Sequence, residues 1–436
     1  MIIRKFYFLI KAFFIQQWWD FNRLNKFQNL KLRFILRYAG KNVNFYHHLF
    51  NKLNLDPDKF KGIEDLKLLP IINNELVVAN LPDFIAQGTA VKKCIKKDSS
   101  GSSGIPMVTY YDLQNYDYVE AIYARAFFIH QLKPWDRMAY FWYKPFEKKK
   151  LWEHLGLMKK NLILFTEPVE TQIKKLISMK PTVIHCFPST LYSIAKEVKK
   201  NSLPIRPRLI ITHGETVTRQ MREFLEATFH CRLLDEYGLS EFTRIAWECP
   251  QGGGYHVDDD YLIVEILKDD QTPAQPGERG MIVITSLFNL AMPLIRYATG
   301  DIGIRGPKTK CKCGREFSKI LEIEGRNDDF VILPSGKLIS PRQVLDSIQK
   351  DSYFNTDEFT EKIYRYKIIQ KDYDKFIVFI VARRNIDETF KKEIAVRIQE
   401  ALREKIEVTV QLVQDLPLTK HGKYKILISD IQKTTC

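Results

Sequence analysis

The sequence predicts an α/β protein with a large multi-layer domain, a β subdomain and a small α+β domain at its C-terminal end. Strand-like and helix-like segments alternate between residues 138 and 229, which is typical of a layered domain with a substantially parallel sheet. After residue 255 the pattern changes to strands separated by Pro/Gly turns. From residue 327 onward strands and helices are mixed again.

These changes of pattern predict three parts of the chain. Residues 1–90 are mostly helical in pattern and form the helical N-terminal region of the large domain. Residues 91–326 complete the large domain with its β subdomain. Residues 327–436 form the small domain, and a segment of about 110 residues is long enough to fold on its own.

Apolar periodicity places individual elements within these parts. In the large domain we expect helices at residues 30–38, 45–53, 118–132, 190–200 and 219–229, and strands at residues 138–143, 162–165, 182–187 and 208–212. The β subdomain is expected to use strands within residues 261–269, 281–287 and 293–306. The small domain is expected to use strands within residues 328–340, 363–370, 375–383 and 407–413, and helices within residues 341–350 and 387–405.

Composition limits the classes of function. A chain of 436 residues, 45% of them hydrophobic, can bury a large core. Its formal net charge of +15 favours an anionic ligand, and by charge alone a nucleotide, a coenzyme, a nucleic acid or an anionic membrane remains open. The sequence has no zinc-finger, RNP-like or Arg-rich tract, so we expect no nucleic-acid partner. Seven cysteines, an odd number, favour a reducing compartment, and we expect the protein in the cytoplasm.

The first 24 residues are apolar and basic. Lys11 interrupts the apolar run, which is shorter than the roughly 20 residues of a transmembrane helix, and no small-residue cleavage site follows. Two interpretations remain open. The one we favour is an amphipathic helix packed on the body of the protein, and the other is a basic, aromatic helix that makes peripheral contact with a membrane surface.

A run of serine and glycine precedes the Ile-Pro pair at residues 105–106. Small residues allow backbone N–H groups to converge on an anion, and serine hydroxyls add further donors, so the run is a candidate polyphosphate cradle. A flexible linker remains the alternative, because the run lacks the Gly-Lys-Ser/Thr ending of a Walker loop. The run consists of Ser99, Ser100, Gly101, Ser102, Ser103 and Gly104.

Five further motifs follow the run in order. They are HGETVT at residues 213–218, DEYGLSEF at 235–242, IRYATGDIG at 295–303, EGRNDDFVILPSGK at 324–337 and LPLTKHGKYK at 416–425. With these residues the chain resembles the adenylate-forming superfamily, most closely its phenylacetate-CoA ligase branch, which includes capsular polysaccharide biosynthesis homologues. The resemblance implies that ATP activates a carboxylic acid as an acyl-adenylate, and that a thiol, expected to be coenzyme A, then displaces AMP.

The resemblance also implies roles for residues of the large domain. The Ser99–Gly104 run would wrap the β and γ phosphates of ATP. Gly214 and Glu215 would lie beside the adenine, and Tyr237 and Gly238 would border the base and the acyl pocket. Ser240 and Glu241 would face the α-phosphate and its Mg²⁺, a hard cation that favours carboxylate oxygens.

Four further residues complete the implied site. Asp301 matches the aspartate that accepts both ribose hydroxyls, a task suited to a two-oxygen acceptor. Arg326 matches an arginine beside the ribose and phosphate. Asp328 matches the hinge about which a mobile small domain rotates between the two half-reactions. Lys423 matches the lysine that reaches the α-phosphate and the carboxylate during adenylation.

The sequence departs from the superfamily pattern at two places. Met107 follows Pro106, where the wider superfamily has a lysine, although the phenylacetate branch also does without it. Leu345 lies near the position of an expected glutamate in the segment SPRQVLDSI. The first departure concerns phosphate binding, and the second concerns thiol transfer.

Four metal-ligating residues form two pairs. Cys249 and His256 flank a glycine run, and Cys311 and Cys313 form a Cys-Lys-Cys-Gly knuckle. Together they supply three thiolates and one imidazole, the ligands of a closed structural Zn²⁺ site. Four unrelated residues with free thiols are the alternative. His185 and Cys186, by contrast, are expected in the core on a buried strand.

Three functions remain open from the sequence. The first is the acid–thiol ligase. The second keeps adenylation but changes the acceptor, as in capsule biosynthesis or in adenylation of a deazaflavin coenzyme. The third is a non-catalytic scaffold, against which the joint presence of Glu241, Asp301, Arg326 and Lys423 argues, because a scaffold has no need for all four. The sequence does not identify the acid.

Overall fold

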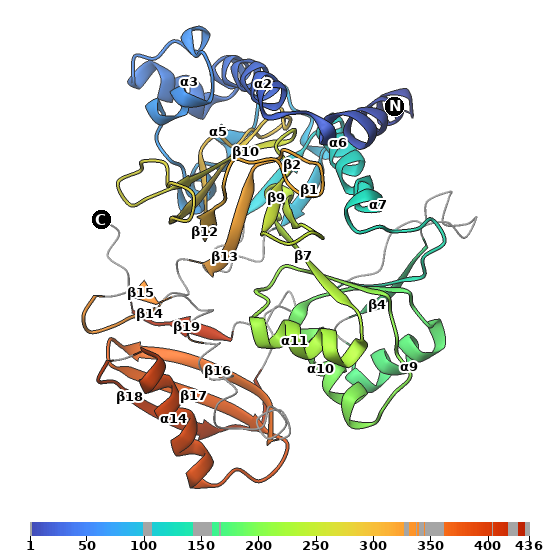
Figure 1. Cartoon of the computed structure of the whole chain (residues 1–436). Helices are drawn as coiled ribbons and strands as arrows, with labels where there is room; N and C mark the ends of the chain where they lie inside the picture. Colours follow the sequence, from blue (N-terminus) through green and yellow to red (C-terminus); the bar gives the residue numbers. More distant parts are fainter. Residues whose placement is uncertain are drawn as a thin grey trace. The chain divides into compact units, whose positions relative to one another are not determined.

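The structure is a computed structural model that describes residues 2–98, 107–142, 159–164, 167–326, 331–336, 338–339, 344, 362–402, 404–416 and 426–431. The chain forms two compact units, each built from two separate stretches of sequence (Figure 1). Unit 1 contains Met1–Leu132 and Glu236–Ile323, and unit 2 contains Lys133–Asp235 and Glu324–Cys436.

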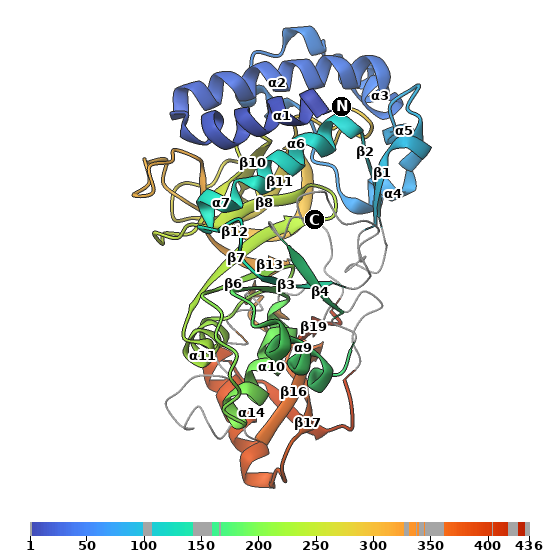
Figure 2. The ribbon, with the colours of Figure 1, turned by 90° about the vertical axis from the view of Figure 1, so that its right-hand side faces the viewer.

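Unit 1 begins with helices. They are α1 (Ile2–Ile10), α2 (Phe21–Asn42), α3 (Asn44–Lys52), α4 (Asn74–Ala79), α5 (Leu81–Phe84), α6 (Leu113–Ala124) and α7 (Ala126–Ile129). Helix α2 starts where the Asp20 side chain accepts a hydrogen bond from the Arg23 backbone N–H at 2.8 Å, a typical N-cap. Its buried stripe, which includes Leu24, Leu32 and Ala39, repeats at helical spacing. Helix α1 packs along α6 (Figure 2).

The strands of unit 1 form a sheet and a separate hairpin. The sheet has the order β10-β11-β12-β13-β9-β8-β7. Its strands are β7 (Arg232–Leu239), β8 (Thr243–Glu248), β9 (Tyr255–Val257), β10 (Leu262–Leu267), β11 (Arg279–Ser286), β12 (Tyr297–Arg305) and β13 (Lys319–Arg326). The hairpin pairs β1 (Ile95–Asp98) with β2 (Val108–Tyr111) in antiparallel fashion, with Asp98 opposite Val108.

A network of buried charges joins the helices of unit 1 to its sheet. Arg125 is fully buried and forms ion pairs with Asp258, at 3.1 Å, and with Asp260. Arg244 pairs with Asp258 at 3.0 Å and with Glu236 at 3.3 Å. Buried charges are tolerated when they are paired in this way, and removing one partner leaves a costly unpaired charge.

Unit 2 contains a parallel sheet flanked by helices. Strands β3 (Met138–Trp142), β4 (Lys160–Leu164), β5 (Val183–Cys186) and β6 (Leu209–His213) follow β7 in the order β7-β6-β5-β3-β4. The helices are α9 (Val169–Met179), α10 (Pro188–Lys200) and α11 (Arg219–Phe229). Thr218 caps α11 by accepting a hydrogen bond from the Met221 backbone N–H at 3.1 Å. This part confirms the predicted alternation of parallel strands and helices.

The C-terminal part of unit 2 has a core of its own. A four-stranded sheet has the order β18-β17-β16-β19 and is accompanied by helix α14 (Glu388–Leu402). Its strands are β16 (Ile363–Asp372), β17 (Lys375–Ala382), β18 (Glu407–Leu412) and β19 (Leu427–Ser429), and β14 (Val331–Ile332) pairs with β15 (Leu338–Ile339). The predicted helix at residues 341–350 lies outside the described residues, apart from Val344.

The predicted fold class is confirmed, with a large many-stranded sheet and a C-terminal mixed sheet. The boundaries drawn from the sequence at residues 90 and 326 stay a prediction. Among the described residues, no helix has both the length and the apolar character that crossing a bilayer requires.

Candidate functional site

The serine/glycine run joins the two strands of the β1–β2 hairpin. The run itself, Ser99 to Gly104, lies outside the described residues, but the strands on either side are paired, with Asp98 opposite Val108. Met107, just before β2, is fully buried, and its sulfur accepts a hydrogen bond from the Tyr297 hydroxyl at 3.7 Å. Both strands belong to unit 1, so the run does not link two units of the protein.

Asp301 is held by a tyrosine from a neighbouring part of unit 1. The Tyr237 hydroxyl donates a hydrogen bond to Asp301 Oδ2 at 2.6 Å, and the Asp301 backbone N–H donates to Thr299 Oγ1 at 3.0 Å. The residue is 6% exposed, so the carboxylate is set in a mostly dry environment. A short hydrogen bond to an ionised oxygen fixes the plane of the carboxylate and prepares it to accept hydroxyl donors.

Glu241 and Met107, the residue just before β2, share a contact with Tyr297. The Glu241 Oε1 is 3.4 Å from the Tyr297 hydroxyl, the same group that contacts Met107. The backbone carbonyl of Ser240 accepts a hydrogen bond from the Tyr111 hydroxyl at 2.8 Å, which ties the YGLSE segment to strand β2. The structure thus brings Ser240 and Glu241 close to Met107 and strand β2.

The turn between β7 and β8 depends on Gly238. A Cβ atom at this position would lie 2.3 Å from the Thr243 carbonyl oxygen, closer than any real contact. The strand pairing shifts register between Tyr237 and Gly238, which is typical of a β-bulge. The glycine therefore allows the bulge that aims Tyr237 at Asp301.

Gly214 and Glu215 follow strand β6 in unit 2. Gly214 has a left-handed φ of +77°, which favours glycine. The Glu215 carboxylate accepts hydrogen bonds from the Ser189 backbone N–H at 2.9 Å and from the Ser189 hydroxyl at 3.0 Å. Since Ser189 lies in the first turn of α10, Glu215 satisfies a free N–H at a helix N-terminus. Glu215 thus fixes the connection that follows β6.

A cluster of aromatic and histidine side chains lies on the same strands and was not predicted from the sequence. The His213 ring lies 4.5 Å from the His185 ring and 4.6 Å from the Phe187 ring, between centroids. The Tyr140 ring is 4.9 Å from that of His185, and Trp142 stacks on Phe187 at 6.2 Å. Ligands of open α/β sheets bind beyond the carboxyl ends of parallel strands, where Trp142, Phe187 and His213 lie.

The prediction for the HC pair on β5 has a mixed outcome. Cys186 is fully buried, as expected, and burial raises the pKa of its thiol. His185 is only half-buried and belongs to the aromatic cluster. The sequence did contain a signal for this cluster. Each of three neighbouring strands ends with, or is followed by, an aromatic residue or a histidine.

Three predicted site residues cannot be placed by their side chains. Arg326 is the last residue of β13, and its side chain is outside the part of the chain that the structure describes. Asp328 and Lys423 lie outside the described residues. Their predicted roles stay predictions.

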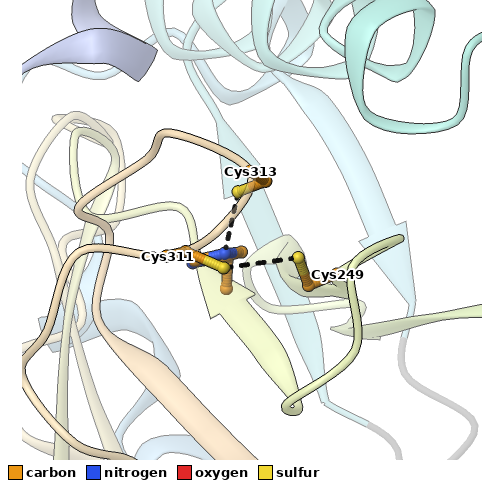
Figure 3. Close-up of side chains that lie close together, drawn as sticks. Cys249, Cys311 and Cys313 are labelled. Atoms are coloured by element: carbon orange, nitrogen blue, oxygen red, sulfur yellow. Dashed lines mark hydrogen bonds between the residues drawn. The ribbon is translucent and has the colours of Figure 1, made fainter.

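The predicted metal ligands come together in unit 1. The ligand atoms of Cys249, His256, Cys311 and Cys313 all lie within 4.8 Å of one another. The sulfurs of Cys249 and Cys311 are 3.6 Å apart, and Cys313 Sγ is 3.4 Å from His256 Nε2. Figure 3 shows the three cysteine side chains pointing toward a common centre. The first three ligands are buried and Cys313 is half-buried, so the cluster is closed.

Two glycine-containing turns shape the cluster. Gly254 has a φ of +92°, and a Cβ atom there would lie 2.4 Å from the Ile320 carbonyl oxygen. In the second turn the Gly314 backbone N–H donates to the Cys311 carbonyl oxygen at 2.9 Å. The Gln251 N–H also points at Cys249 Sγ at 3.4 Å, and a hydrogen bond from the Cys249 thiol lowers the pKa of Cys313. This hydrogen bond therefore favours the thiolate form of Cys313.

Comparison with known proteins identifies relatives of the chain. Residues 339–430 match the family described as the CapK C-terminal domain. Phenylacetate-coenzyme A ligase of Thermus thermophilus is 26% identical over 334 residues, which cover 74% of this chain and 74% of that protein. Protein CapK of Staphylococcus aureus is 24% identical over 426 residues, which cover 94% of this chain and 90% of CapK. The chain is a relative of the phenylacetate-CoA ligases and of CapK.

Solved structures agree on the fold of this phenylacetate-CoA ligase relative. 2-Hydroxyisobutyryl-CoA ligase in complex with R3-HIB-AMP has a TM-score of 0.78 at 17% identity, covering 95% of this chain and 91% of that one. The anthranilate CoA ligase AuaEII in complex with anthranoyl-AMP has a TM-score of 0.56 at 16% identity, covering 90% and 78%. The fold is that of the adenylate-forming acyl-CoA ligases, as the sequence motifs indicated.

Proposed function

We propose that the protein uses ATP to convert a carboxylic acid into an acyl-adenylate, and then transfers the acyl group to coenzyme A. In the first step a carboxylate oxygen attacks the α-phosphorus and pyrophosphate leaves. In the second step the thiol attacks the acyl carbonyl and AMP leaves. The main observation in support is the buried Asp301 carboxylate, which is held by a hydrogen bond from Tyr237. The chain that contains this pair is also related to phenylacetate-CoA ligases.

Each site residue takes a role that suits its chemistry. Asp301 accepts hydrogen bonds from the two ribose hydroxyls, and Tyr237 and Gly238 border the adenine and the acyl pocket. Ser240 and Glu241 face the α-phosphate, where Glu241 would hold a Mg²⁺ ion that neutralises phosphate charge. The Ser99–Gly104 run wraps the β and γ phosphates.

The remaining roles concern unit 2. Gly214 and Glu215 shape the wall beside the adenine, and Arg326 lies near the ribose and phosphate. Asp328 acts as the hinge of the small domain. Lys423 supplies the cation for the reacting phosphate and carboxylate, a role that Met107 cannot fill from the phosphate loop.

The test of adenylation is carboxylate-dependent exchange of labelled pyrophosphate into ATP, measured with aryl, short-chain and sugar-derived acids. We expect exchange with at least one class of acid. Asp301→Asn is expected to raise the KM for ATP about 10- to 100-fold, since a hydrogen bond to a charged group contributes about 1.5–3 kcal/mol. Asp270→Asn, a matched change in an exposed turn, should leave the KM unchanged. Absence of exchange across the whole panel would favour the scaffold alternative.

Two further measurements test the assignment of roles. Lys423→Ala should abolish pyrophosphate exchange while ATP binding persists. Unchanged exchange would show that Lys423 does not supply the cation for the reacting phosphate and carboxylate. Addition of coenzyme A to an exchanging reaction should yield an acyl thioester. A thioester would be detected by mass spectrometry and by its reaction with hydroxylamine.

A different acceptor is the second candidate. The match to CapK spans more of the chain than the match to the Thermus thermophilus phenylacetate-coenzyme A ligase, and the C-terminal residues match the CapK C-terminal domain. This match supports, as the second candidate, an acceptor other than coenzyme A, such as a capsular sugar. Exchange without thioester formation would support this candidate, or the deazaflavin alternative. Both candidates need ATP, which agrees with the predicted cytoplasmic location.

We also infer that Cys249, His256, Cys311 and Cys313 hold a structural Zn²⁺ ion. Zn–S bonds of about 2.3 Å at tetrahedral angles give S···S separations of ~3.8 Å, and Zn–N bonds of about 2.0 Å give S···N separations of ~3.5 Å. The separations of 3.6 Å and 3.4 Å in the cluster fit these values. His256 Nδ1 is 3.3 Å from the Phe317 carbonyl oxygen, which leaves Nε2 free of a proton and suited to bind the metal.

A further inference from the structure

Helix α1 is apolar on two sides, and the body of unit 1 covers one of them. On the covered side Ala12, in the π-helical turn Lys11–Ile15 that follows α1, is fully buried. The Phe8 ring meets Tyr118 of α6 edge-on at 5.2 Å. Arg4 and Lys5 also face α6, where they pair with Asp117 and Glu120. The amphipathic helix packed on the body of the protein, which the sequence favoured, is therefore present. Packing accounts for the apolar residues on its covered side but not for those on its exposed side.

The other side of the segment is exposed and consists of large apolar residues. We call it the N-terminal apolar face. Its side chains are between 38% and 85% exposed, and they are Ile3, Phe6, Tyr7, Ile10, Phe14, Ile15 and Trp18. Most of them repeat at intervals of three and four residues, which places them on one side of the segment.

Helix α7 extends this face. The Phe128 ring, in a residue that is 41% exposed, lies 6.3 Å from Phe14 and 6.4 Å from Trp18 between centroids. It also lies 4.4 Å from the Phe13 ring. The face is therefore a continuous patch built from two segments far apart in the sequence. A patch of this kind marks an interaction site in a soluble protein.

The N-terminal apolar face belongs to a basic part of the chain. Residues 2–42 contain nine lysines and arginines and one acidic residue, Asp20, a net charge of +8. Lys11 Nζ lies 5.5 Å above the Tyr7 ring and 5.4 Å above the Phe27 ring, at the border of the face. A Cβ atom at Gly314 would lie 3.5 Å from Trp18, and the exposed Lys312 precedes Gly314 by two residues in the sequence.

We propose that the N-terminal apolar face seats the protein on an anionic lipid surface. Tyr and Trp favour the region between lipid chains and water, and apolar side chains enter the outer part of the bilayer. Lysines and arginines at the rim attract anionic headgroups. A second copy of the chain fits less well, because residues 2–42 are rich in basic residues in both copies and would repel each other. Since no described helix spans a bilayer, the contact is peripheral.

The proposal is tested with the full chain and sedimenting vesicles. We expect it to sediment with vesicles that contain 40% phosphatidylglycerol in phosphatidylcholine, and to remain in solution with phosphatidylcholine alone or at high salt. The double variant Phe6→Ser, Phe14→Ser should lower the vesicle partition coefficient at least about tenfold. Lys11→Gln should lower it about fivefold, as one basic residue near an anionic surface contributes about 1 kcal/mol.

The matched control is Tyr373→Ser, which removes an aromatic residue that is 47% exposed on unit 2. It should sediment as the unaltered chain does. Ile3→Ser, at a side chain that is 85% exposed, replaces the double variant if that variant fails to fold.

Four results would overturn the proposal. They are no sedimentation with anionic vesicles, equal sedimentation with phosphatidylcholine alone, unchanged sedimentation of the folded double variant, and a dimer that the double variant converts to monomers without any vesicle binding. The last result would assign the face to contact between two copies of the chain.

Discussion

Replacing Cys311 by alanine tests whether the cysteine–histidine cluster is a structural metal site. The substitution removes one of the three thiols and leaves the knuckle without its buried ligand. We expect the purified variant to lose bound zinc, measured by mass spectrometry of the metal, and to unfold at a lower temperature. Both losses follow from one cause, since structural zinc sites contribute directly to the free energy of folding.

The size of the effect follows from the loop that the metal closes. Cys249 and Cys311 are 62 positions apart in the sequence. A cross-link across a loop of that length removes about 4 kcal/mol of chain entropy from the unfolded state. For a folding unit of roughly 200 residues this corresponds to a fall in melting temperature on the order of 10 °C.

The control is Cys94→Ala, which removes a half-buried thiol of unit 1 outside the cluster. It should retain zinc and melt close to the unaltered protein. If the purified unaltered protein contains no zinc and is nevertheless stably folded, the metal site is refuted. A Cys311→Ala variant that melts within about 2 °C of the unaltered protein would refute the energetic reasoning, because it implies a change of less than about 1 kcal/mol.

Three further predictions concern unit 1 and are measured by urea unfolding. Arg125→Met should lower the free energy of unfolding by about 3–5 kcal/mol, because it leaves the buried Asp260 without its cation and Asp258 with Arg244 as its remaining partner. Arg219→Met on the exposed face of α11 should cost less than about 1 kcal/mol. Burial raises the pKa of Asp259 from 3.8 to about 7, so between these two pH values the folded state retains a proton that the unfolded state releases. The free energy of unfolding should therefore fall as the pH rises from 3.8 to about 7. Asp259→Asn should make this fall shallower, and an unchanged pH profile would contradict the assignment. Phe8→Ala should cost about 3–5 kcal/mol and Phe6→Ala little, since the first side chain is 8% and the second 62% exposed, and equal costs would mean that α1 does not pack as described.

Local signals explain why some elements were predicted closely. Helix α11 runs from Arg219 to Phe229, as expected, because Thr218 caps its start and His230 ends it in a left-handed conformation. Strand β5 lies within the expected residues 182–187 because its apolar run ends at a Phe-Pro step. In both cases the residues that set the boundary are adjacent to the element in sequence.

Distant contacts explain where the prediction fell short. Helix α2 begins at Phe21, well before the expected start at Leu30. Part of its early buried stripe is polar, since the Gln28 side chain donates hydrogen bonds to the carbonyl oxygens of Asp259 and Leu262, both at 2.9 Å. A glutamine in a core-facing position breaks the apolar periodicity, and its partners are more than 200 residues away.

The same distinction applies to the candidate site. Residue types and their order were enough to predict the cysteine–histidine cluster, because thiol and imidazole ligands have few other reasons to occur together. The hydrogen bond from Tyr237 to Asp301 could not be predicted, since it depends on a bulge at Gly238. The buried pair of Arg125 and Asp258 was also missed, because charged residues are usually exposed unless a distant partner is present.

The division of each unit into two stretches has a consequence for how the protein is made. Arg125 leaves the ribosome 133 residues before Asp258, its buried partner. At 5–20 residues per second, roughly 7–27 seconds pass between the two events. During that interval residues 133–235 emerge as an insertion, while the N-terminal helices still lack the strands that cover them. Nascent chains that stop at residue 235 should therefore bind chaperones most strongly. Resistance to protease should first appear in chains that extend beyond Ile323, where unit 1 is complete.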